Sequence, residues 1–234
     1  MNEVREAERS LGRPLMVASV AFLAVLVLMT VLSALGTPEG DTVAARLAAL
    51  AREDTVYRLG FFFASLVPAT MVPLMALIAV VADRGGPVAR PYAVTGALLV
   101  AAYAPLSAAA YASQYTVFTW LLARDLPAAA PWYFGNEHGA VITFDLLAYA
   151  IWGTGAILLA RPLLAQGGIR RLLAWALLAS GATSIVAFGL HALGVSAAGP
   201  LSVVSGALTV PIGVLALLLG RAFARAGAGR SAGQ

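Results

Sequence analysis

Six long apolar segments limit what this chain can fold into more than any other feature of its sequence. Each holds about the 20 residues that an α-helix needs to cross a hydrocarbon core of about 30 Å, and the third is long enough to tilt or project beyond it. The sequence therefore predicts an all-α polytopic membrane protein, a six-transmembrane-helix bundle in a single domain over residues 1–220. The predicted spans are 14–35, 59–82, 92–122, 140–160, 172–193 and 201–220.

The composition agrees with this class and excludes several kinds of chemistry. Of the 234 residues, 61% are hydrophobic and only 11% are charged, where about 25% is usual for a soluble protein. Cysteine is absent, which excludes disulfides, cysteine-ligated metals and thiol catalysis. All fifteen basic residues are arginine, so Schiff-base chemistry on lysine is also excluded.

The arginines predict how the bundle is oriented. With the N-terminus inside, eleven arginines fall on inner segments and four on outer segments, and positive residues favour the cytoplasmic side. Both termini are therefore expected to be cytoplasmic, in a bacterial plasma membrane as the Ala, Gly and Arg bias suggests. Because the arginines lie at helix ends and form no folded basic patch, we expect membrane lipids as partners and no nucleic acid.

Three segments outside the spans have a recognisable character. Residues 41–53 place apolar side chains at helical spacing and predict a short amphipathic helix on the outer surface. Residues 131–139 bring three aromatic residues to the membrane interface. The small and polar residues of 221–234 predict a flexible cytoplasmic tail.

Polar residues inside the third and fourth spans share helical faces. At about 100° per residue, the polar positions of each span fall within about 80° of one another. In the third span these are Tyr103, Ser107, Tyr111 and Gln114, and in the fourth they are His138, Asp145, Tyr149 and Trp152. A polar group in lipid is costly unless it faces protein or water, so both faces are expected to point into the bundle.

Asp145 is the only acidic residue well inside a predicted span, and it focuses the search for a site. We expect an outward-facing polar cavity around it. Its candidate residues are Asp145, His138, His191, Gln114, Tyr111, Glu137 and Tyr149. The simpler alternative is that Asp145 hydrogen-bonds a Tyr or Ser and ties two helices together.

Three functions are compatible with such a cavity. The first is binding or transport of a small or lipid-like molecule, with Asp145 as a protonatable group. The second is a membrane-embedded enzyme that uses His138, Asp145 and Glu137 as acid–base groups. The third is a structural membrane subunit without chemistry. His138, His191 and Asp145 are acceptable metal ligands, but they lack a diagnostic spacing, so no metal and no cofactor is predicted.

Residues 57–79, 111–122 and 131–159 resemble uncharacterised bacterial multi-pass membrane proteins of the DUF4386 type. The resemblance rests on hydrophobic patterns, on size and on the number of spans. It implies a helical bundle in the plasma membrane, and it assigns no catalytic residue and no substrate.

Overall fold

The long apolar segments form six helical segments that are long and apolar enough to cross a membrane. The computed structural model describes residues 2–195 and 197–228, and these contain helices and no strand. This confirms the predicted all-α bundle, and each observed segment lies on a predicted span. The six are Ser10–Leu35, Thr55–Asp83, Ala89–Leu122, Ala140–Leu164, Gly168–Ala192 and Ala198–Arg225.

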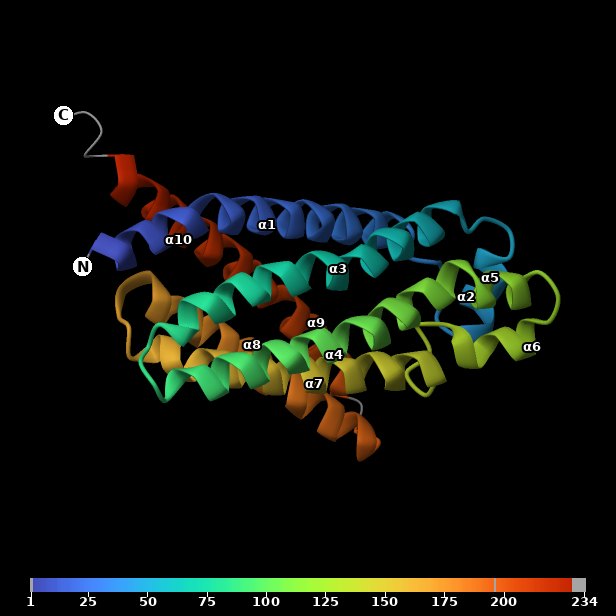
Figure 1. The fold of residues 1–234 in the computed structure, drawn as a ribbon. Coiled ribbons are helices and arrows are strands. Elements are labelled where there is room, and N and C mark those ends of the chain that lie inside the picture. The colour runs from blue at the N-terminus through green and yellow to red at the C-terminus, as the bar shows by residue number, and fades with distance from the viewer. Residues whose placement is uncertain (1, 196, 229–234) are drawn as a thin grey trace.

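Figure 1 shows how these segments divide into helices. The long helices are α1 (Asn2–Leu35), α3 (Thr55–Asp83), α4 (Ala89–Tyr115), α7 (Ala140–Leu164), α8 (Gly168–Ala192) and α10 (Thr209–Ala228). The short ones are α2 (Val43–Leu50), α5 (Val117–Leu122), α6 (Leu126–Ala129), the 3₁₀ turn η1 (Ala130–Trp132) and α9 (Ala198–Ala207).

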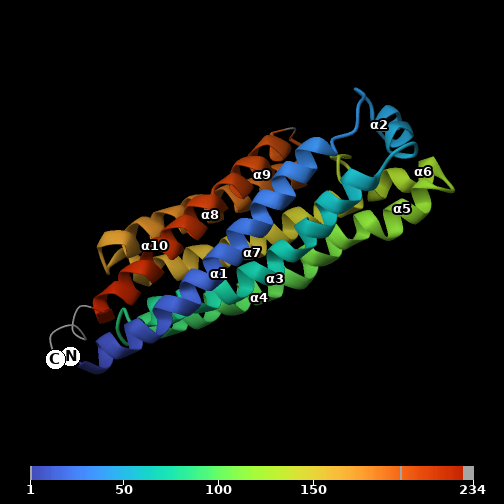
Figure 2. The same ribbon diagram turned by 90° about the horizontal axis from the view of Figure 1, so that it is seen from above.

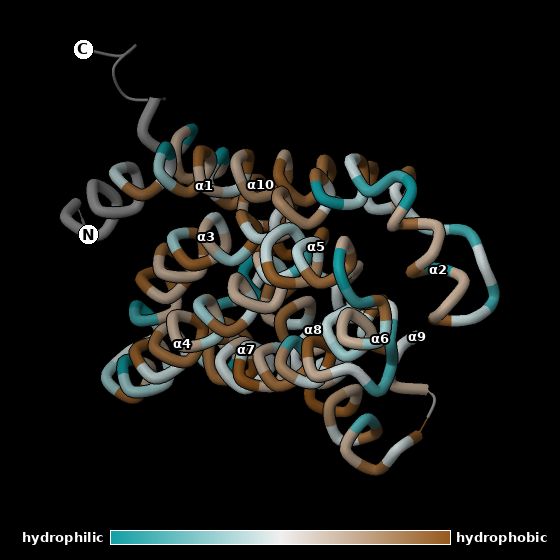
Figure 3. Tube along the Cα trace, turned by 90° about the vertical axis from the view of Figure 1, so that its right-hand side faces the viewer, coloured by the Kyte–Doolittle hydropathy of each residue, from teal (hydrophilic) through white to brown (hydrophobic). Residues whose placement is uncertain are grey.

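The two ends of the bundle differ. The short elements α2, α5 and α6 gather at one end, which we call the cap end (Figures 1 and 2). The first turns of α1 and the last turns of α10 lie together at the other, the terminal end, where a Cβ on Gly12 would lie 3.0 Å from the Gly220 carbonyl oxygen. Seen from the cap end, hydrophilic segments follow mainly the connections, and hydrophobic segments dominate the helices (Figure 3).

Close glycine contacts hold α7 between α4 and α8. A Cβ on Gly155 would lie 2.8 Å from the carbonyl oxygen of Gly96 in α4. A Cβ on Gly153 would lie 2.5 Å from the carbonyl oxygen of Gly181 in α8. Small residues let membrane helices approach at this range. These two contacts fix the register of α7 against both neighbours.

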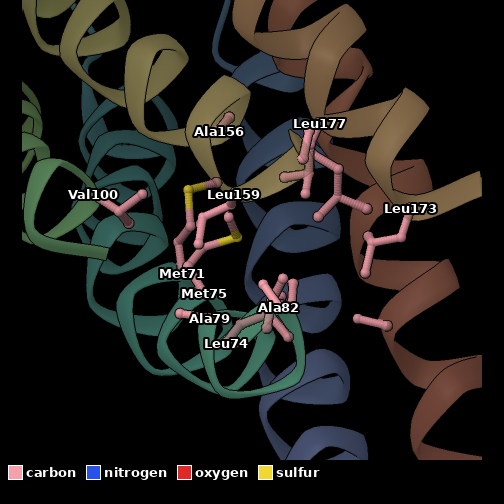
Figure 4. Close-up of a cluster of buried hydrophobic side chains, with 14 of the residues drawn as sticks. Met71, Leu74, Met75, Ala79, Ala82, Val100, Ala156, Leu159, Leu173 and Leu177 are labelled. Atoms are coloured by element: carbon pink, nitrogen blue, oxygen red, sulfur yellow. The ribbon is translucent and has the colours of Figure 1, made fainter. Parts of the chain in front are cut away.

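An apolar core fills the bundle toward the terminal end. Figure 4 shows side chains of α3, α4, α7 and α8 meeting there, among them Met71, Met75, Val100 and Leu159. Met75 and Leu159 are fully buried and Val100 is 1% exposed. The buried side chains of this half of the α4–α7 contact are therefore apolar, and the buried polar residues Ser107 and Asp145 lie on its cap-end side.

Two of the spans are interrupted, where the sequence predicts continuous helices. The third breaks at Thr116, whose φ and ψ are −120° and −89°. Its hydroxyl donates to the carbonyl of Ala112 at 2.7 Å and so competes with the helical hydrogen bonds. The sixth breaks at Leu208, between α9 and α10. Pro211 lacks an N–H and leaves the carbonyl of Ala207 without its helical donor.

The segments outside the spans also differ from the simplest expectation. Helix α2 lies within the predicted segment 41–53, but its apolar residues Leu47 and Leu50 are both 3% exposed and pack against the cap instead of lipid. The predicted flexible tail 221–234 is helical as far as Ala228, the end of α10. Its remaining residues, 229–234, lie outside the described part of the chain.

Candidate functional site

Helices α4 and α7 bring a group of polar side chains together inside the bundle. The two helices are antiparallel, and the spacing of four residues stacks Tyr103, Ser107 and Tyr111 on one face of α4, opposite Asp145 and Tyr149 of α7. We call these five residues the oxygen cluster. Tyr103 and Ser107 are fully buried, Tyr111 and Asp145 are 6% and 4% exposed, and Tyr149 is half-buried.

The five side chains of the oxygen cluster form a ring of contacts, in which each lies beside two others. The Ser107 hydroxyl donates to Oδ1 of Asp145 at 3.3 Å. The hydroxyls of Tyr111 and Tyr149 are 3.2 Å apart. Tyr111 also interacts with the carboxyl group of Asp145. Tyr103 closes this ring of contacts, because its hydroxyl lies near those of Ser107 and Tyr149.

The cluster carries one acidic group and no basic group. In the described part of the chain Asp145 forms no ion pair, and the ion pair found there joins Arg58 and Asp54 near the cap end, at 3.9 Å. The carboxyl group therefore depends on neutral hydroxyls. Ionisable residues within membrane helices are rare and costly, so Asp145 is a candidate functional group.

Two buried polar atoms of α4 and α7 lack a hydrogen bond among the described residues. One is the hydroxyl of Tyr103 and the other is Nε1 of Trp152. Both side chains are fully buried, and their rings lie 6.1 Å apart between centroids. Buried polar groups without partners are rare in proteins, and each calls for an explanation.

Gln114, by contrast, uses its whole hydrogen-bonding capacity inside the protein. Its Oε1 accepts from the Tyr57 hydroxyl at 2.7 Å and from the Phe134 amide at 3.1 Å. Its Nε2 donates to the Trp132 carbonyl at 2.8 Å and to the Ser113 hydroxyl at 3.0 Å. Gln114 thus ties α3, α4 and the 131–139 loop together and leaves no polar atom for a ligand.

The 131–139 loop covers the cap-end side of the oxygen cluster. The ring of Phe134 lies 5.6 Å from that of Tyr111 and 5.1 Å from that of Phe61 in α3. Asn136 holds the turn of the loop, since its Nδ2 donates to the Ala130 carbonyl at 2.9 Å. Aromatic side chains therefore separate Asp145 from the surface at the cap end.

The remaining candidates from the sequence lie apart from Asp145. Glu137 and His138 are exposed on the loop that precedes α7. Nε2 of His191 lies 2.9 Å from the hydroxyl of Thr143, at the cap-end edge of the α7–α8 contact. The structure thus brings together Asp145, Tyr111 and Tyr149, and leaves the two histidines outside.

The described residues also contain no group of three or more His, Asp or Glu side chains that could hold a metal ion.

An ionisable tyrosine lies in the cap, outside the spans. Burial raises the pKa of Tyr133, and the nearby guanidinium of Arg46 opposes part of that rise. Arg46 itself donates from Nε to the Gly40 carbonyl at 2.8 Å. Arg46 of α2 thus contacts both the loop before α2 and Tyr133 of the 131–139 loop, and this contact belongs to the cap and not to the oxygen cluster.

A pocket of about 260 Å³ lies between α4 and α7 on the side of the bundle. Seven residues line it, and most are apolar: Leu106, Ala109, Ala110, Ser113, Trp132, Val141 and Phe144. We call it the side groove. Phe144 and Trp132 are 52% and 37% exposed at its edges. The polar faces of the sequence did not reveal it, because apolar residues of a span look alike whether they face lipid or a groove.

These features define the chain as a multi-pass transmembrane protein with a buried oxygen cluster and an apolar groove on one pair of helices. A scan of protein-family models and searches of curated proteins and of solved structures found no match.

Proposed function

We propose that this chain binds a small lipid-like molecule in the side groove and moves it within or across a bacterial plasma membrane. The cap end is on the outside and both termini are cytoplasmic, as the arginine distribution predicts. The observation that carries the proposal is the groove itself, since it is apolar, opens on the side of two membrane helices and holds about 260 Å³.

The size and lining of the groove suit an alkyl chain or a small ring. A protein cavity of about 150 Å³ is enough to bind benzene. The described lining offers Ser113 as its only hydroxyl side chain, and that hydroxyl donates to the Ala110 carbonyl at 2.7 Å. The indole of Trp132 lies at the cap end of the groove, at the level where aromatic belts meet lipid headgroups.

The groove and the oxygen cluster share the same pair of helices, which offers a way to couple them. Phe144 lines the groove and Asp145 follows it in α7, while Leu106 lines the groove and Ser107 follows it in α4. An occupant that separates α4 from α7 would lengthen the 3.3 Å hydrogen bond between Ser107 and Asp145. Ligand binding would then change the surroundings of a protonatable group.

The enzyme alternative has less support from the geometry. Its three acid–base residues are split, since Asp145 is buried and both His138 and Glu137 are exposed on the loop. A subunit without chemistry remains the simplest competing explanation, and it predicts no specific ligand in the side groove.

Photo-crosslinking tests the proposal directly. Purified protein is labelled with a photoreactive fatty acid, and the modified peptides are identified by mass spectrometry. Ala109→Phe fills the groove from its exposed edge and should abolish labelling of α4 and α7. Ala101→Phe is the matched control, because Ala101 is also an exposed alanine of α4 but does not line the groove. Equal labelling of the two variants would contradict the proposal.

The proposed orientation of the chain in the membrane can be tested by cysteine labelling. The sequence contains no cysteine, so only an introduced one would react. Ala123→Cys places a thiol at the cap end and Ala165→Cys places one near the terminal end, both at exposed alanines. A membrane-impermeant maleimide should label only Ala123→Cys in intact cells. Labelling of only Ala165→Cys would reverse the orientation.

A further inference from the structure

We propose that the oxygen cluster between α4 and α7 binds one small monovalent cation, Na⁺ or K⁺. This site is separate from the side groove, and the inference does not require that the groove binds a lipid. It rests on the chemistry of the five side chains, on the hydroxyl of Tyr103 and on the spacing of the oxygens.

The ligand set favours an alkali cation over other metals. All five side chains present oxygen, which suits hard cations, whereas transition metals prefer the nitrogen and sulfur ligands that this cluster lacks. The cluster carries a single carboxyl group. A divalent ion is usually held by several carboxylates, so one negative charge matches one positive charge.

The distances between the oxygens fit a shared coordination shell. Ca²⁺, which is close to Na⁺ in radius, holds its oxygen ligands at about 2.3–2.6 Å, and two ligands at right angles are then about 3.3–3.7 Å apart. The larger K⁺ requires a wider spacing. Ser107 Oγ and Asp145 Oδ1 are 3.3 Å apart, and the hydroxyls of Tyr111 and Tyr149 are 3.2 Å apart. The Ser107–Asp145 pair thus already has the spacing of neighbouring ligands of an ion of this size, and the Tyr111–Tyr149 pair lies just below that range.

The hydroxyl of Tyr103 is the independent sign that a ligand belongs here. Its side chain is fully buried, and its hydroxyl faces those of Ser107 and Tyr149 without the distance and angle of a hydrogen bond to either or to any other described residue. An unmet hydroxyl in a bundle core costs free energy unless something else contacts it. A cation within the cluster would take its free lone pair.

Thermal unfolding of the full chain in detergent tests the proposal. The midpoint is measured in NaCl, in KCl and in N-methyl-D-glucamine chloride at equal concentration and pH, so that ionic strength and anion stay fixed. A ligand that binds only the folded state raises the midpoint with its concentration. We expect a rise in NaCl or KCl that saturates, and none with the bulky organic cation.

Substitutions test whether the salt-dependent rise in the unfolding midpoint comes from the oxygen cluster. Asp145→Asn should abolish the salt-dependent rise, and Tyr103→Phe, which removes only a hydroxyl, should shift its half-saturating concentration upward. Ser184→Ala removes a buried hydroxyl between α8 and α9 and should keep the rise unchanged. If Asp145→Asn fails to fold, Ser107→Ala replaces it, because it removes one proposed ligand and keeps the charge.

Two results would overturn the proposal. One is the same midpoint for the wild-type chain in all three salts, which is the outcome if the cluster holds only water. The other is a salt-dependent rise that survives in both Asp145→Asn and Tyr103→Phe. Ala109→Phe separates this test from that of the groove, since it should lose lipid labelling and keep the response to salt.

Discussion

The bundle contains two buried groups of hydroxyls, and they are built differently. Between α8 and α9, Ser184 and Ser205 are joined through their hydroxyls at 2.5 Å, and Ser184 also donates to the Ser180 carbonyl at 2.8 Å. Ser180 and Ser205 each contact the carbonyl of the other, at 3.4 Å and 3.3 Å. Every hydroxyl of this serine cluster is satisfied, and no ionisable side chain belongs to it.

The oxygen cluster between α4 and α7 has a carboxyl group without a basic partner and a tyrosine hydroxyl without a hydrogen bond among the described residues. The contrast suggests how to interpret polar residues in membrane helices. Saturated hydroxyls tie helices together, whereas unsaturated ones beside a charge indicate a place for a ligand.

The largest expected loss of stability comes from replacing Gln114, whose side-chain polar atoms are all hydrogen-bonded. Gln114→Leu keeps the volume but leaves the Tyr57 hydroxyl, the Phe134 amide and the Trp132 carbonyl without their partner. Because each buried group left unpaired costs about 1–3 kcal/mol, the free energy of unfolding should fall by about 3 kcal/mol or more. Unfolding by sodium dodecyl sulfate in mixed micelles measures it. A loss no larger than that of a surface variant would show that the cap is not fastened through Gln114.

Gly155→Leu should have the next largest effect, and it should act on the α4–α7 contact, which carries the oxygen cluster, and leave the serine cluster unchanged. Its side chain would collide with the carbonyl of Gly96, 2.8 Å from the position of a Cβ. Overpacking costs about 1–3 kcal/mol, and it would move α4 away from α7. The same unfolding assay gives the cost, and the response to salt should disappear. Gly189→Leu is the control, because a Cβ at Gly189 meets nothing within 4 Å.

Ser184→Ala should have a small effect. It removes the interhelical hydroxyl contact with Ser205 and the hydrogen bond to the Ser180 carbonyl within α8, and interhelical hydrogen bonds in membrane proteins contribute about 0.6 kcal/mol on average. The unfolding free energy should fall by about that amount in any salt. A loss that appeared only in NaCl or KCl would mean that the serine cluster also binds a cation. The proposed difference between the serine cluster and the oxygen cluster would then be wrong.

Tyr103→Phe should have the smallest effect when no alkali cation is present. The hydroxyl it removes makes no hydrogen bond among the described residues, so the unfolding free energy in N-methyl-D-glucamine chloride should not fall. In NaCl or KCl the variant should be less stable than the wild-type chain. A clear loss in both media would show that this hydroxyl is an ordinary structural partner.

The sequence predicted the spans and the faces of the site better than the site itself. Hydropathy gave all six segments, because lipid demands long apolar helices. Helical periodicity placed Tyr111, Asp145 and Tyr149 toward the bundle interior, since it needs only the spacing within each helix. Which residues meet across α4 and α7 depends on the register set by Gly96 and Gly155, and no pattern in one helix reveals that register.

The position of His138 on the 131–139 loop and the side groove were not predicted from the sequence, for different reasons. His138 precedes α7 at a spacing that fits the helical face, yet α7 begins only at Ala140 and Asn136 turns the chain before it. The side groove is lined by residues such as Leu106 and Val141, which have the same character as residues facing lipid. Its existence depends on how two helices diverge, and hydropathy carries no information about that.

The number of cations bound by the oxygen cluster can be measured directly. Equilibrium dialysis of the detergent-solubilised full chain against radioactive sodium or a potassium analogue, with Ser184→Ala and Asp145→Asn alongside, gives the number bound per chain. We expect saturation near one cation for the wild-type chain and for Ser184→Ala, and none for Asp145→Asn. No saturable binding to the wild-type chain, or equal binding to Asp145→Asn, would contradict it.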